Sequence, residues 1–381
     1  AEERGEEKVN NTAGAAYILG AVFVKWLSDK KGLDADSLKI SIGTDSRISG
    51  PDLKKGFIAG VASEGARIFD CSMASTPAMF MSTVIEEFSC HGAVMITASH
   101  LPWNRNGFKF FTNIGSLEKK DIGDLLKMAA VKEFPNSIPE ASAESIPLMD
   151  RYCSIFIKKI RESINWPDNY EKPLTGMKIV VDAGNGAGGF FAYNILKPLG
   201  ADIDGSVFLD PDGMFPNHEP NPENSKAMES IRDAVIKNRA DLGIIFDTDV
   251  DRSAIVDAGG IIINRNSLIA LISAVILEEH PGTTVVTDSV TSEGLRIFIE
   301  DKLGGRHHRF KRGYKNVINE AVRLNREGEE CHLAIETSGH GAMKENYFLD
   351  DGAYLAARLV IKAALLKLEN KGSILYLIKD L

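Results

Sequence analysis

A loop between two hydrophobic strand patterns carries several side chains that could do chemistry. Residues 93–111 (AVMITASHLPWNRNGFKFF) begin and end as apolar, strand-like sequence. Between those ends lie the hydroxyl of Ser99, the imidazole of His100 and the ammonium group of Lys109. Loops are generally polar, so this composition alone does not establish a site. Whether the loop has a function depends on the rest of the chain.

Three carboxylates follow another apolar strand pattern. Asp247, Asp249 and Asp251 alternate within IIFDTDVDRSAIVD, and Arg252 comes next. Carboxylates this close together repel one another unless a cation neutralises them, and oxygen ligands suit Mg²⁺ better than zinc. A solvated Asp-rich turn is the alternative. The loop does not match an EF-hand, because its sixth position is not Gly and its twelfth is not Glu. Its place at the end of a buried strand favours a metal site.

A third polar group also follows a strand. In AIETSGHGAMKEN, Glu336 and Ser338 stand two residues apart, with His340 beyond them. A carboxylate and a hydroxyl at this spacing could hold vicinal hydroxyls through paired acceptor and donor hydrogen bonds. A turn that binds nothing uses Ser-Gly as readily, so both interpretations stay open.

Two further strand-to-loop turns carry basic side chains. In IGTDSRISG, Arg47 either takes a phosphate bidentately or pairs with Asp45. The stretch RFKRGYKNV places four basic side chains together in an acidic chain, at Arg309, Lys311, Arg312 and Lys315. This patch suits a phosphate, and a solvated edge strand explains it equally well.

One glycine pattern suggests a different chemistry. Gly184-x-Gly186-x-x-Gly189 lies between a strand and a helix pattern, with Asp202 and Asp204 about 20 residues further on. This spacing satisfies the dinucleotide-binding fingerprint and makes an NAD-linked oxidoreductase a less favoured alternative. A tight turn needs glycine for backbone reasons alone, and this copy does not lie in the first strand–helix–strand unit.

The bulk composition limits the partners. The chain has 381 residues, 44% of them hydrophobic and 25% charged, with a net charge of −9. An acidic balance argues against a nucleic-acid partner. The four cysteines lie far apart, which indicates free thiols in a reducing compartment. No apolar run approaches the roughly 20 residues that span a bilayer, so we expect no membrane partner. The start, AEERGEEKVNN, has neither a Met nor an apolar targeting segment.

Strand and helix patterns alternate along the chain, which predicts an α/β fold with mixed, largely parallel sheets. Among the helices, we expect those over 78–88, 190–199 and 292–303. We expect three consecutive similar domains, and the weakly hydrophobic stretch 135–147, a linker or long loop, precedes the first boundary. The predicted domains are 1–148 with the Ser99 loop, 149–260 with the three carboxylates, and 261–381 with the Glu336 loop. In open parallel sheets, ligands bind outside the carboxyl ends of the strands. The polar groups described above all lie at such ends.

Taken together, the motifs resemble those of the α-D-phosphohexomutases, the phosphoglucomutases and phosphomannomutases. TASHLPWNRNGFK is similar to the family's phosphoserine loop, DTDVDR to its metal loop and ETSGH to its sugar-recognition loop. GTDSR and RGYKN add to the resemblance. The three main motifs occur in the order and spacing of the family's first three domains, so the resemblance covers essentially the whole chain.

The resemblance implies a role for each candidate residue. Ser99 would carry the transferred phosphoryl group, and Asp247, Asp249 and Asp251 would bind Mg²⁺ together with an oxygen of that phosphate. The other implied residues either line the transfer site (His100, Lys109 and Arg252) or contact the sugar phosphate (Arg47, Tyr314, Lys315, Glu336, Ser338 and His340).

The implied reaction interconverts hexose 1-phosphate and hexose 6-phosphate, of glucose or mannose. The phosphoserine phosphorylates the free hydroxyl of the substrate, and the resulting hexose 1,6-bisphosphate turns over before its other phosphate returns to Ser99. The bisphosphate therefore serves as intermediate and activator. Positioning and charge neutralisation by a metal and by cations supply most of the catalysis in such a transfer.

The chain departs from the family pattern at both ends. We find no match to the family's opening Gly/Arg segment or to the R-x-S-G-T-E-P-type loop of its fourth domain, and we therefore expect a fragment that lacks the fourth domain. Leu101 and Thr248 replace a common Asn and Gly. A catalytically silent phosphosugar-binding protein is the main alternative. We further expect a monomer or weak homodimer, located inside the cell in the cytoplasm or plastid stroma.

Overall fold

The computed structural model describes residues 9–381. Contacts between residues divide this part of the chain into two compact units. The first unit extends to Tyr152 and also includes Asp212–Pro216, whereas the second comprises Cys153–Pro211 and Asn217–Leu381. Each unit is described by itself. None of the described helices is both long enough and apolar enough to cross a membrane.

The first unit is built on a six-stranded mixed sheet with the order β5-β4-β3-β1-β2-β6. Its strands are β1 (Lys39–Thr44), β2 (Arg67–Met73), β3 (Gly92–Ile96), β4 (Phe108–Thr112), β5 (Gly115–Ser116) and β6 (Glu144–Ser145). β1 runs parallel to β2 and β3, and β4 returns antiparallel to β3. The central strands are buried along nearly their whole length, as apolar runs such as AVMI require.

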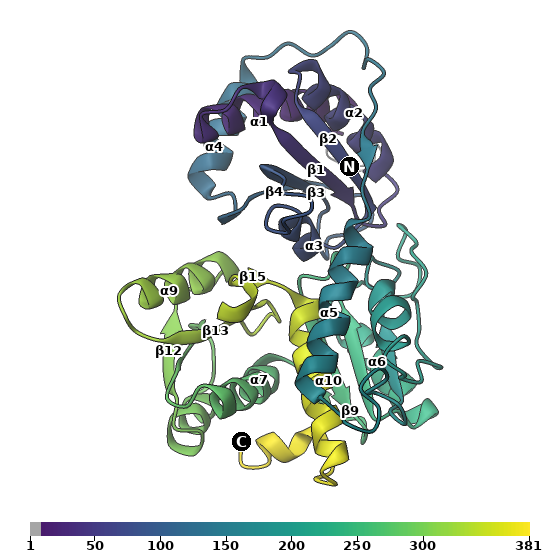
Figure 1. The fold of residues 1–381 in the computed structure, drawn as a ribbon, viewed down its shortest axis with the longest axis vertical. Coiled ribbons are helices and arrows are strands. Elements are labelled where there is room, and N and C mark those ends of the chain that lie inside the picture. Colours follow the sequence, from purple (N-terminus) through teal and green to yellow (C-terminus); the bar gives the residue numbers. More distant parts are fainter. Residues whose placement is uncertain (1–8) are drawn as a thin grey trace. The chain divides into compact units, whose positions relative to one another are not determined.

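Four helices accompany this sheet, and they lie at the purple and blue end of the colour bar (Figure 1). They are α1 (Ala13–Lys31), α2 (Gly50–Ser63), α3 (Thr76–Met81) and α4 (Lys119–Ala130). α1 and α2 cross so closely that a Cβ on Gly60 would lie 2.0 Å from the Tyr17 carbonyl oxygen. Phe23 of α1 and Phe57 of α2 then pack with Phe110 of β4 in one core. The core holds the strands whose ends carry the first candidate loop.

The second unit contains two sheets. The first has the order β10-β9-β8-β7, and the second the order β12-β11-β13-β14-β15. The strands of the first sheet are β7 (Ile179–Asp182), β8 (Leu242–Phe246), β9 (Ser253–Asp257) and β10 (Ile262–Ile263). Those of the second are β11 (Thr284–Asp288), β12 (Arg306–Phe310), β13 (Cys331–Ile335), β14 (Gly341–Met343) and β15 (Leu349–Asp350). Both sheets combine parallel pairs, β7 with β8 and β11 with β13, with antiparallel pairs, β8 with β9 and β13 with β14.

Helices cover both sheets of the second unit. They are α5 (Leu148–Ile164), which starts in the first unit, α6 (Ser225–Asn238), α7 (Arg265–Glu279), α8 (Glu293–Ile297), α9 (Tyr314–Arg326) and α10 (Gly352–Leu368). α6 packs against β7, β8 and β9, and α9 packs against β11 and β13. α10 contacts β8 and β9 of one sheet, β14 of the other and also α7. This apolar helix therefore contacts both sheets of the unit, and the yellow α10 lies beside β9 in Figure 1.

The predicted fold class, α/β with mixed sheets, is confirmed, and three such sheets follow one another along the chain. The strands of the described residues are not largely parallel, because six of the twelve pairs of neighbouring strands are antiparallel. Several local predictions were wrong. The helix expected over 78–88 ends at Met81, because turns replace it, and the stretch 135–147 contributes β6 to the sheet. The helices expected over 190–199 and 292–303 contain the π-helical segments η2 (Phe191–Leu196) and η3 (Phe298–Lys302).

Candidate functional site

The Ser99 loop, residues 97–107, connects β3 to β4 in the first unit. The backbone of Thr97 bonds to that of Gly107 across its base (3.0 Å). Ser99 adopts a left-handed backbone with φ of +50°, and its N–H donates to the Thr97 hydroxyl (2.9 Å). Such a conformation costs about 1–3 kcal/mol in a non-glycine residue and persists only where its surroundings hold it. The His100 Nδ1 lies 3.5 Å from the Ser99 Oγ. Lys109 lies on β4, where it pairs with Met95 of β3.

The side chain of Arg47 holds the backbone of this loop in place. Its side chain is fully buried and pairs with Asp45 through Nε (3.2 Å). The two terminal nitrogens donate to four backbone carbonyls of the loop, those of Ser99 (2.5 Å), Leu101 (2.6 Å), Pro102 (2.7 Å) and Arg105 (2.9 Å). A guanidinium has five N–H donors, and these five bonds use all of them. Of the two sequence interpretations, the structure shows the pairing with Asp45, and it leaves Arg47 no N–H with which to take a phosphate.

The carboxylate turn, residues 247–252, joins the antiparallel strands β8 and β9 in the second unit. Asp247, Asp249 and Asp251 are all buried, and one oxygen from each lies within 4.8 Å of the others. Arg252 is equally buried, and its Nη2 lies 3.3 Å from the Asp247 carboxylate. Burial lowers the pKa of Arg252, but the charges of Asp247, Asp251 and Asp249 outweigh it and raise the pKa overall.

The donor set of this turn fits a hard divalent cation. Three buried carboxylates face one arginine, so a negative charge remains that water screens poorly. All three ligands are oxygen atoms, which is the preference of Mg²⁺. The three predicted carboxylate ligands are thus brought together. Thr248, which stands where the related motif has Gly, is fully buried.

The Glu336 loop, residues 336–340, follows β13 and leads into β14. Glu336 is buried; its carboxylate accepts hydrogen bonds from the Gly313 N–H (2.5 Å) and the Ser338 hydroxyl (3.3 Å). Burial raises the pKa of Glu336. Through Gly313, the carboxylate fixes the start of α9, where the predicted residues Tyr314 and Lys315 lie. The Tyr314 ring stacks on the His340 ring with centroids 4.8 Å apart.

The carboxylate turn and the Glu336 loop meet within the second unit. Arg252 forms an isolated backbone bridge with His340, and the His340 Nδ1 lies 3.9 Å from Asp251 and 2.5 Å from Asp350. Burial lowers the pKa of His340, but the charges of Asp350 and Asp251 raise it to about 9. The structure therefore gathers Asp247, Asp249, Asp251, Arg252 and His340 in one place. Ser99, His100, Lys109 and Arg47 belong to the first unit.

A glycine at the start of α10 makes this meeting possible. Asp351 caps the helix by accepting from the Tyr354 N–H (2.9 Å). Gly352 donates its N–H to the Val250 carbonyl (3.1 Å), and a Cβ there would lie 2.5 Å from the Arg252 carbonyl carbon. The backbone of α10 thus packs directly on the carboxylate turn.

Several residues of the site were not predicted. Asp350 pairs with His340, and Asp288 accepts from the Thr337 hydroxyl (2.6 Å) and holds the Glu336 loop. Asn221 and Glu223 approach the Arg252 guanidinium at 3.3 Å and 3.7 Å. For Asn221 and Glu223, the only signal in the sequence was the concentration of polar residues in the Pro/Asn-rich stretch 210–224.

The glycine pattern at 184–189 is explained by packing. A Cβ on Gly186 would lie 2.6 Å from the Thr248 carbonyl oxygen, and one on Gly189 would lie 2.3 Å from the Leu209 oxygen. The N–H of Ala187 also donates to the Thr248 oxygen (2.8 Å). Gly186 therefore lets the turn after β7 support the carboxylate turn, and Gly189 lets the chain pack on Leu209. No dinucleotide is needed to explain these two glycines.

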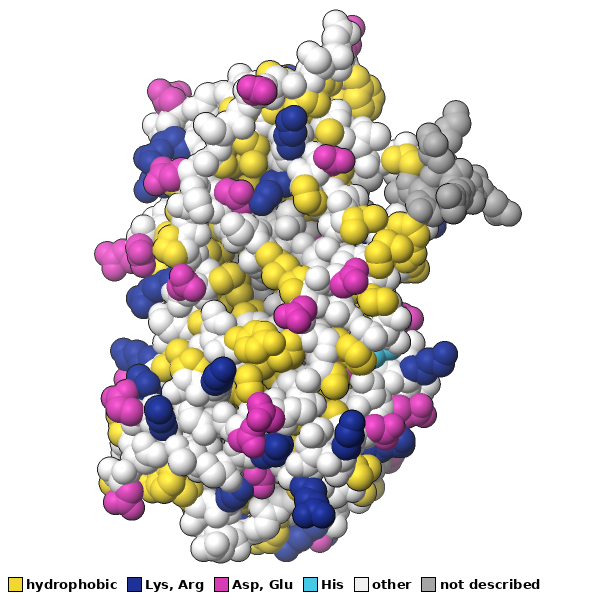
Figure 2. Space-filling model, turned by 90° about the vertical axis from the view of Figure 1, so that its right-hand side faces the viewer, with side chains coloured by type: hydrophobic (Ala, Val, Ile, Leu, Met, Phe, Trp, Pro, Cys, Tyr) yellow, Lys and Arg dark blue, Asp and Glu magenta, His cyan; other side chains and the backbone are white. Residues whose placement is uncertain are grey.

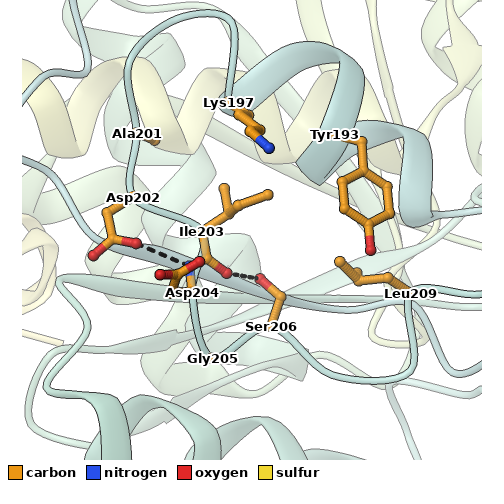
Figure 3. Close-up of a pocket in the computed structure, with 9 residues that line it drawn as sticks. All are labelled: Tyr193, Lys197, Ala201, Asp202, Ile203, Asp204, Gly205, Ser206 and Leu209. Carbon is orange, nitrogen blue, oxygen red and sulfur yellow. Dashed lines mark hydrogen bonds between the residues drawn. The ribbon is translucent and has the colours of Figure 1, made fainter.

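A surface hollow lies elsewhere on the second unit. One side of the hollow is formed by Tyr193, which belongs to η2, and by Lys197, which directly follows η2 (Figure 3). The other side is formed by residues 201–206 and Leu209. None of the predicted site residues lines it. Figure 2 shows acidic and basic side chains interspersed over the face that it draws.

Comparison with solved structures defines the class of the fold. A phosphoglucomutase/phosphomannomutase family protein from Burkholderia thailandensis superposes with a TM-score of 0.78 at 27% sequence identity, covering 94% of this chain and 75% of that one. The α/β sheets with their strand-end loops are therefore those of a phosphohexomutase fold.

Sequence comparison identifies the family. Models described as phosphoglucomutase/phosphomannomutase, alpha/beta/alpha domains I, II and III match residues 2–132, 154–260 and 264–378. A phosphoglucomutase of Neisseria meningitidis is 31% identical over 351 residues, covering 92% of this chain and 71% of the relative. A phosphomannomutase/phosphoglucomutase of Pseudomonas aeruginosa is 32% identical, covering 92% and 70%. The chain belongs to the phosphoglucomutase/phosphomannomutase family of mutases.

Proposed function

We propose that this protein is a Mg²⁺-dependent phosphohexomutase that exchanges a phosphoryl group between Ser99 and a hexose phosphate of glucose or mannose. The observation that carries the proposal is the carboxylate turn, in which Asp247, Asp249 and Asp251 are buried around a shared space beside Arg252 and His340. Membership of a mutase family supports the reaction class. Mg²⁺, when bound, would neutralise the charge of the transferred phosphoryl group.

The chain's own residues have distinct tasks in this proposal. The sugar hydroxyl oxygen forms a bond to phosphorus and gives up its proton to water as the bond between phosphorus and the Ser99 Oγ breaks. The Oγ receives a proton, so the transfer neither gains nor loses protons overall. His100 is placed to supply that proton, because its Nδ1 lies 3.5 Å from the Oγ. Lys109 and Arg252 contribute positive charge to the phosphoryl oxygens. The second transfer reverses these steps with the other phosphate of the hexose 1,6-bisphosphate.

The Glu336 loop is proposed to bind the sugar. Glu336 accepts and Ser338 donates hydrogen bonds, so the pair suits neighbouring hydroxyls. Tyr314, Lys315 and His340 adjoin the same loop and would contact the sugar phosphate. We propose the domain limits 1–148, 149–260 and 261–381, one loop in each, and a monomer or weak homodimer, which analytical ultracentrifugation tests.

Intact mass spectrometry tests the proposed function. After incubation with glucose 1,6-bisphosphate and Mg²⁺, the protein should gain one phosphate that maps to Ser99. Ser99→Ala should abolish the gain, whereas Ser63→Ala, an exposed serine at the end of α2, should retain it. No uptake by the wild-type protein would contradict the proposal. Glucose 1-phosphate binding without uptake would favour a silent phosphosugar-binding protein.

A further inference from the structure

The guanidinium of Arg252 depends on a loop outside the predicted motifs. Its Nη1 donates to the Asn221 Oδ1 (3.3 Å) and lies 3.7 Å from the Glu223 carboxylate. Both partners belong to residues 217–224, which lead from the end of the Pro/Asn-rich stretch to the start of α6. The direction of the Arg252 side chain, buried among carboxylates, is therefore set partly by where this loop lies.

The same loop is internally braced. The Glu219 carboxylate accepts hydrogen bonds from the Asn221 Nδ2 (3.1 Å) and the Asn224 Nδ2 (3.3 Å). The Asn221 Oδ1, which accepts from Arg252, also accepts from the Glu223 N–H (3.0 Å). Any movement of Glu219 would therefore be passed to Asn221, the direct partner of Arg252.

His218 anchors this braced loop to β7. Its side chain is only 3% exposed. The Nε2 lies 2.9 Å from an Asp182 oxygen, and the Nδ1 lies 2.9 Å from the Glu219 carbonyl oxygen. A carboxylate and a carbonyl are acceptors only, so both ring nitrogens must donate and His218 must be an imidazolium ion in this arrangement.

Asp182, the partner of that imidazolium, is itself fixed. It ends β7 and is fully buried. The Ser230 hydroxyl of α6 donates to its Oδ2 (2.7 Å), and the Gly184 N–H donates to its Oδ1 (2.9 Å). The anchor therefore rests on the first sheet of the second unit and on α6, and not on any of the predicted metal ligands.

We infer that His218 is a positioning residue, which holds the loop of residues 217–224 so that Asn221 and Glu223 orient Arg252 for phosphoryl transfer. The inference rests on the proposed function, because it assigns Arg252 to the transfer site. His218 itself touches neither the substrate nor the reacting atoms. A displacement of a catalytic group by about 1 Å costs on the order of 100-fold in rate, so an anchor of this kind has a measurable kinetic effect.

A double-mutant cycle tests the inference. The measured quantity is the rate of phosphate uptake by Ser99 from glucose 1,6-bisphosphate at saturating Mg²⁺. His218→Gln, which cannot donate to both acceptors, should slow uptake by about 10–100-fold while the concentration for half-maximal rate changes little. When Arg252 is already replaced by Lys, His218→Gln should change the uptake rate by less than about threefold. The effects of two substitutions do not add when one residue acts through the other.

The control is a partly buried histidine of the second unit. The His307 Nε2 bonds to the Thr287 hydroxyl (2.7 Å) in the other sheet. Because it lies apart from the residues that hold Arg252, His307→Gln should leave the uptake rate within about threefold of wild type. Equal losses for His218→Gln in the wild-type and Arg252→Lys backgrounds would overturn the inference, as would an unchanged rate or a similar loss in His307→Gln.

A second measurement separates this inference from the proposed function. If the wild-type protein takes up no phosphate, the proposed function fails, and the position of Arg252 is then read directly by NMR. In protein labelled with ¹⁵N-arginine, the Arg252 Nε–H should exchange slowly with water, and His218→Gln should speed that exchange by about tenfold or more. An unchanged exchange rate would show that His218 does not hold Arg252.

Discussion

The two turns that carry a buried arginine differ in how each arginine is used. Arg47 in the first unit and Arg252 in the second each follow an Asp at the end of a buried strand, and each is only 1% exposed. Arg47 gives four of its hydrogen bonds to backbone carbonyls and one to Asp45. Arg252 instead faces side chains, chiefly the Asp247 carboxylate.

This difference separates a structural arginine from one suited to chemistry. Carbonyls carry no net charge, so Arg47 neutralises Asp45 and otherwise shapes the Ser99 loop. The carboxylates around Arg252 outnumber it, so a further cation is favoured there. A similar sequence pattern, Asp followed by Arg in a strand-end turn, therefore produces a loop support in one unit and, in the other, a group of buried carboxylates that suits a cation.

The largest expected effect is the loss of the Arg47 anchor. Arg47→Met removes five hydrogen bonds. It also leaves the buried Asp45 without its cation, which should destabilise the first unit by about 3–5 kcal/mol. The stability of the first unit is measured by urea unfolding, with hydrogen exchange monitored in the segments of the protein that contain β1 and β3. Arg67→Met removes an exposed pair with Glu144 from the same sheet, and should cost less than about 0.5 kcal/mol. Similar values for the two variants would contradict the comparison.

Removal of a metal ligand should have the next largest effect. Mg²⁺ at about 100 times its dissociation constant should stabilise the wild-type second unit by about 2.7 kcal/mol. Asp249→Asn should lose most of this gain, with little loss of stability in the absence of metal, because one buried negative charge disappears. Asp45→Asn is the matched change in the other turn and should retain the Mg²⁺ response. Calorimetric titration with Mg²⁺ distinguishes the two variants, and equal affinities would refute the metal assignment.

The sequence indicated the loops that carry the candidate residues better than it indicated the residues that hold those loops in place. Ligands bind at the carboxyl ends of strands, so each of the loops that carry Asp251 and His340 could be singled out. That the two loops meet could not be predicted, because the strands that they follow belong to different sheets. Asn221 and His218 could not be predicted, because their stretch has no hydrophobic period and a single turn there could place them anywhere. Asp350 was missed since it reaches His340 only through the antiparallel pairing of β14 with β15.

The features that escaped prediction did so for different physical reasons. α1 is buried around much of its circumference and therefore lacks the apolar stripe that marks a surface helix. Helices were expected where η2 and η3 lie, but their π-helical form was not, because a search for the usual α-helical spacing does not distinguish a π-helical turn. The two interpretations of Arg47 were indistinguishable because the sequence does not show which acceptors the fold brings to a guanidinium.

A smaller effect should follow from crowding the carboxylate turn. Unlike the Ser99 loop, this turn is held by backbone contact, and a Cβ on Gly186 would lie 2.6 Å from the Thr248 oxygen. Gly186→Ala should therefore cost about 1–3 kcal/mol and weaken Mg²⁺ binding. Gly294→Ala, where the nearest atom is the Ser292 Oγ at 3.8 Å, should do neither. Thermal unfolding and Mg²⁺ titration of both variants measure this, and an unaffected Gly186→Ala would contradict backbone support of the turn.

The smallest expected effect is a difference in pH dependence between the two anchors. Burial lowers the pKa of His218, but the hydrogen bond and charge of Asp182 outweigh it and raise the pKa above 6.5. A group whose pKa is higher in the folded state contributes its full stability below its unfolded value, and loses it as the pH rises through the folded value. The facing groups are the Asp182 carboxylate, the Glu219 carbonyl and the Phe208 ring.

Hydrogen exchange in residues 217–224 should therefore become faster, beyond the intrinsic change, as the pH rises above 6.5. The Ser99 loop, held by an arginine that stays charged throughout this range, should show no such additional increase. His218→Gln should abolish the difference between the two loops, and a difference that survives the substitution would mean that another group titrates there.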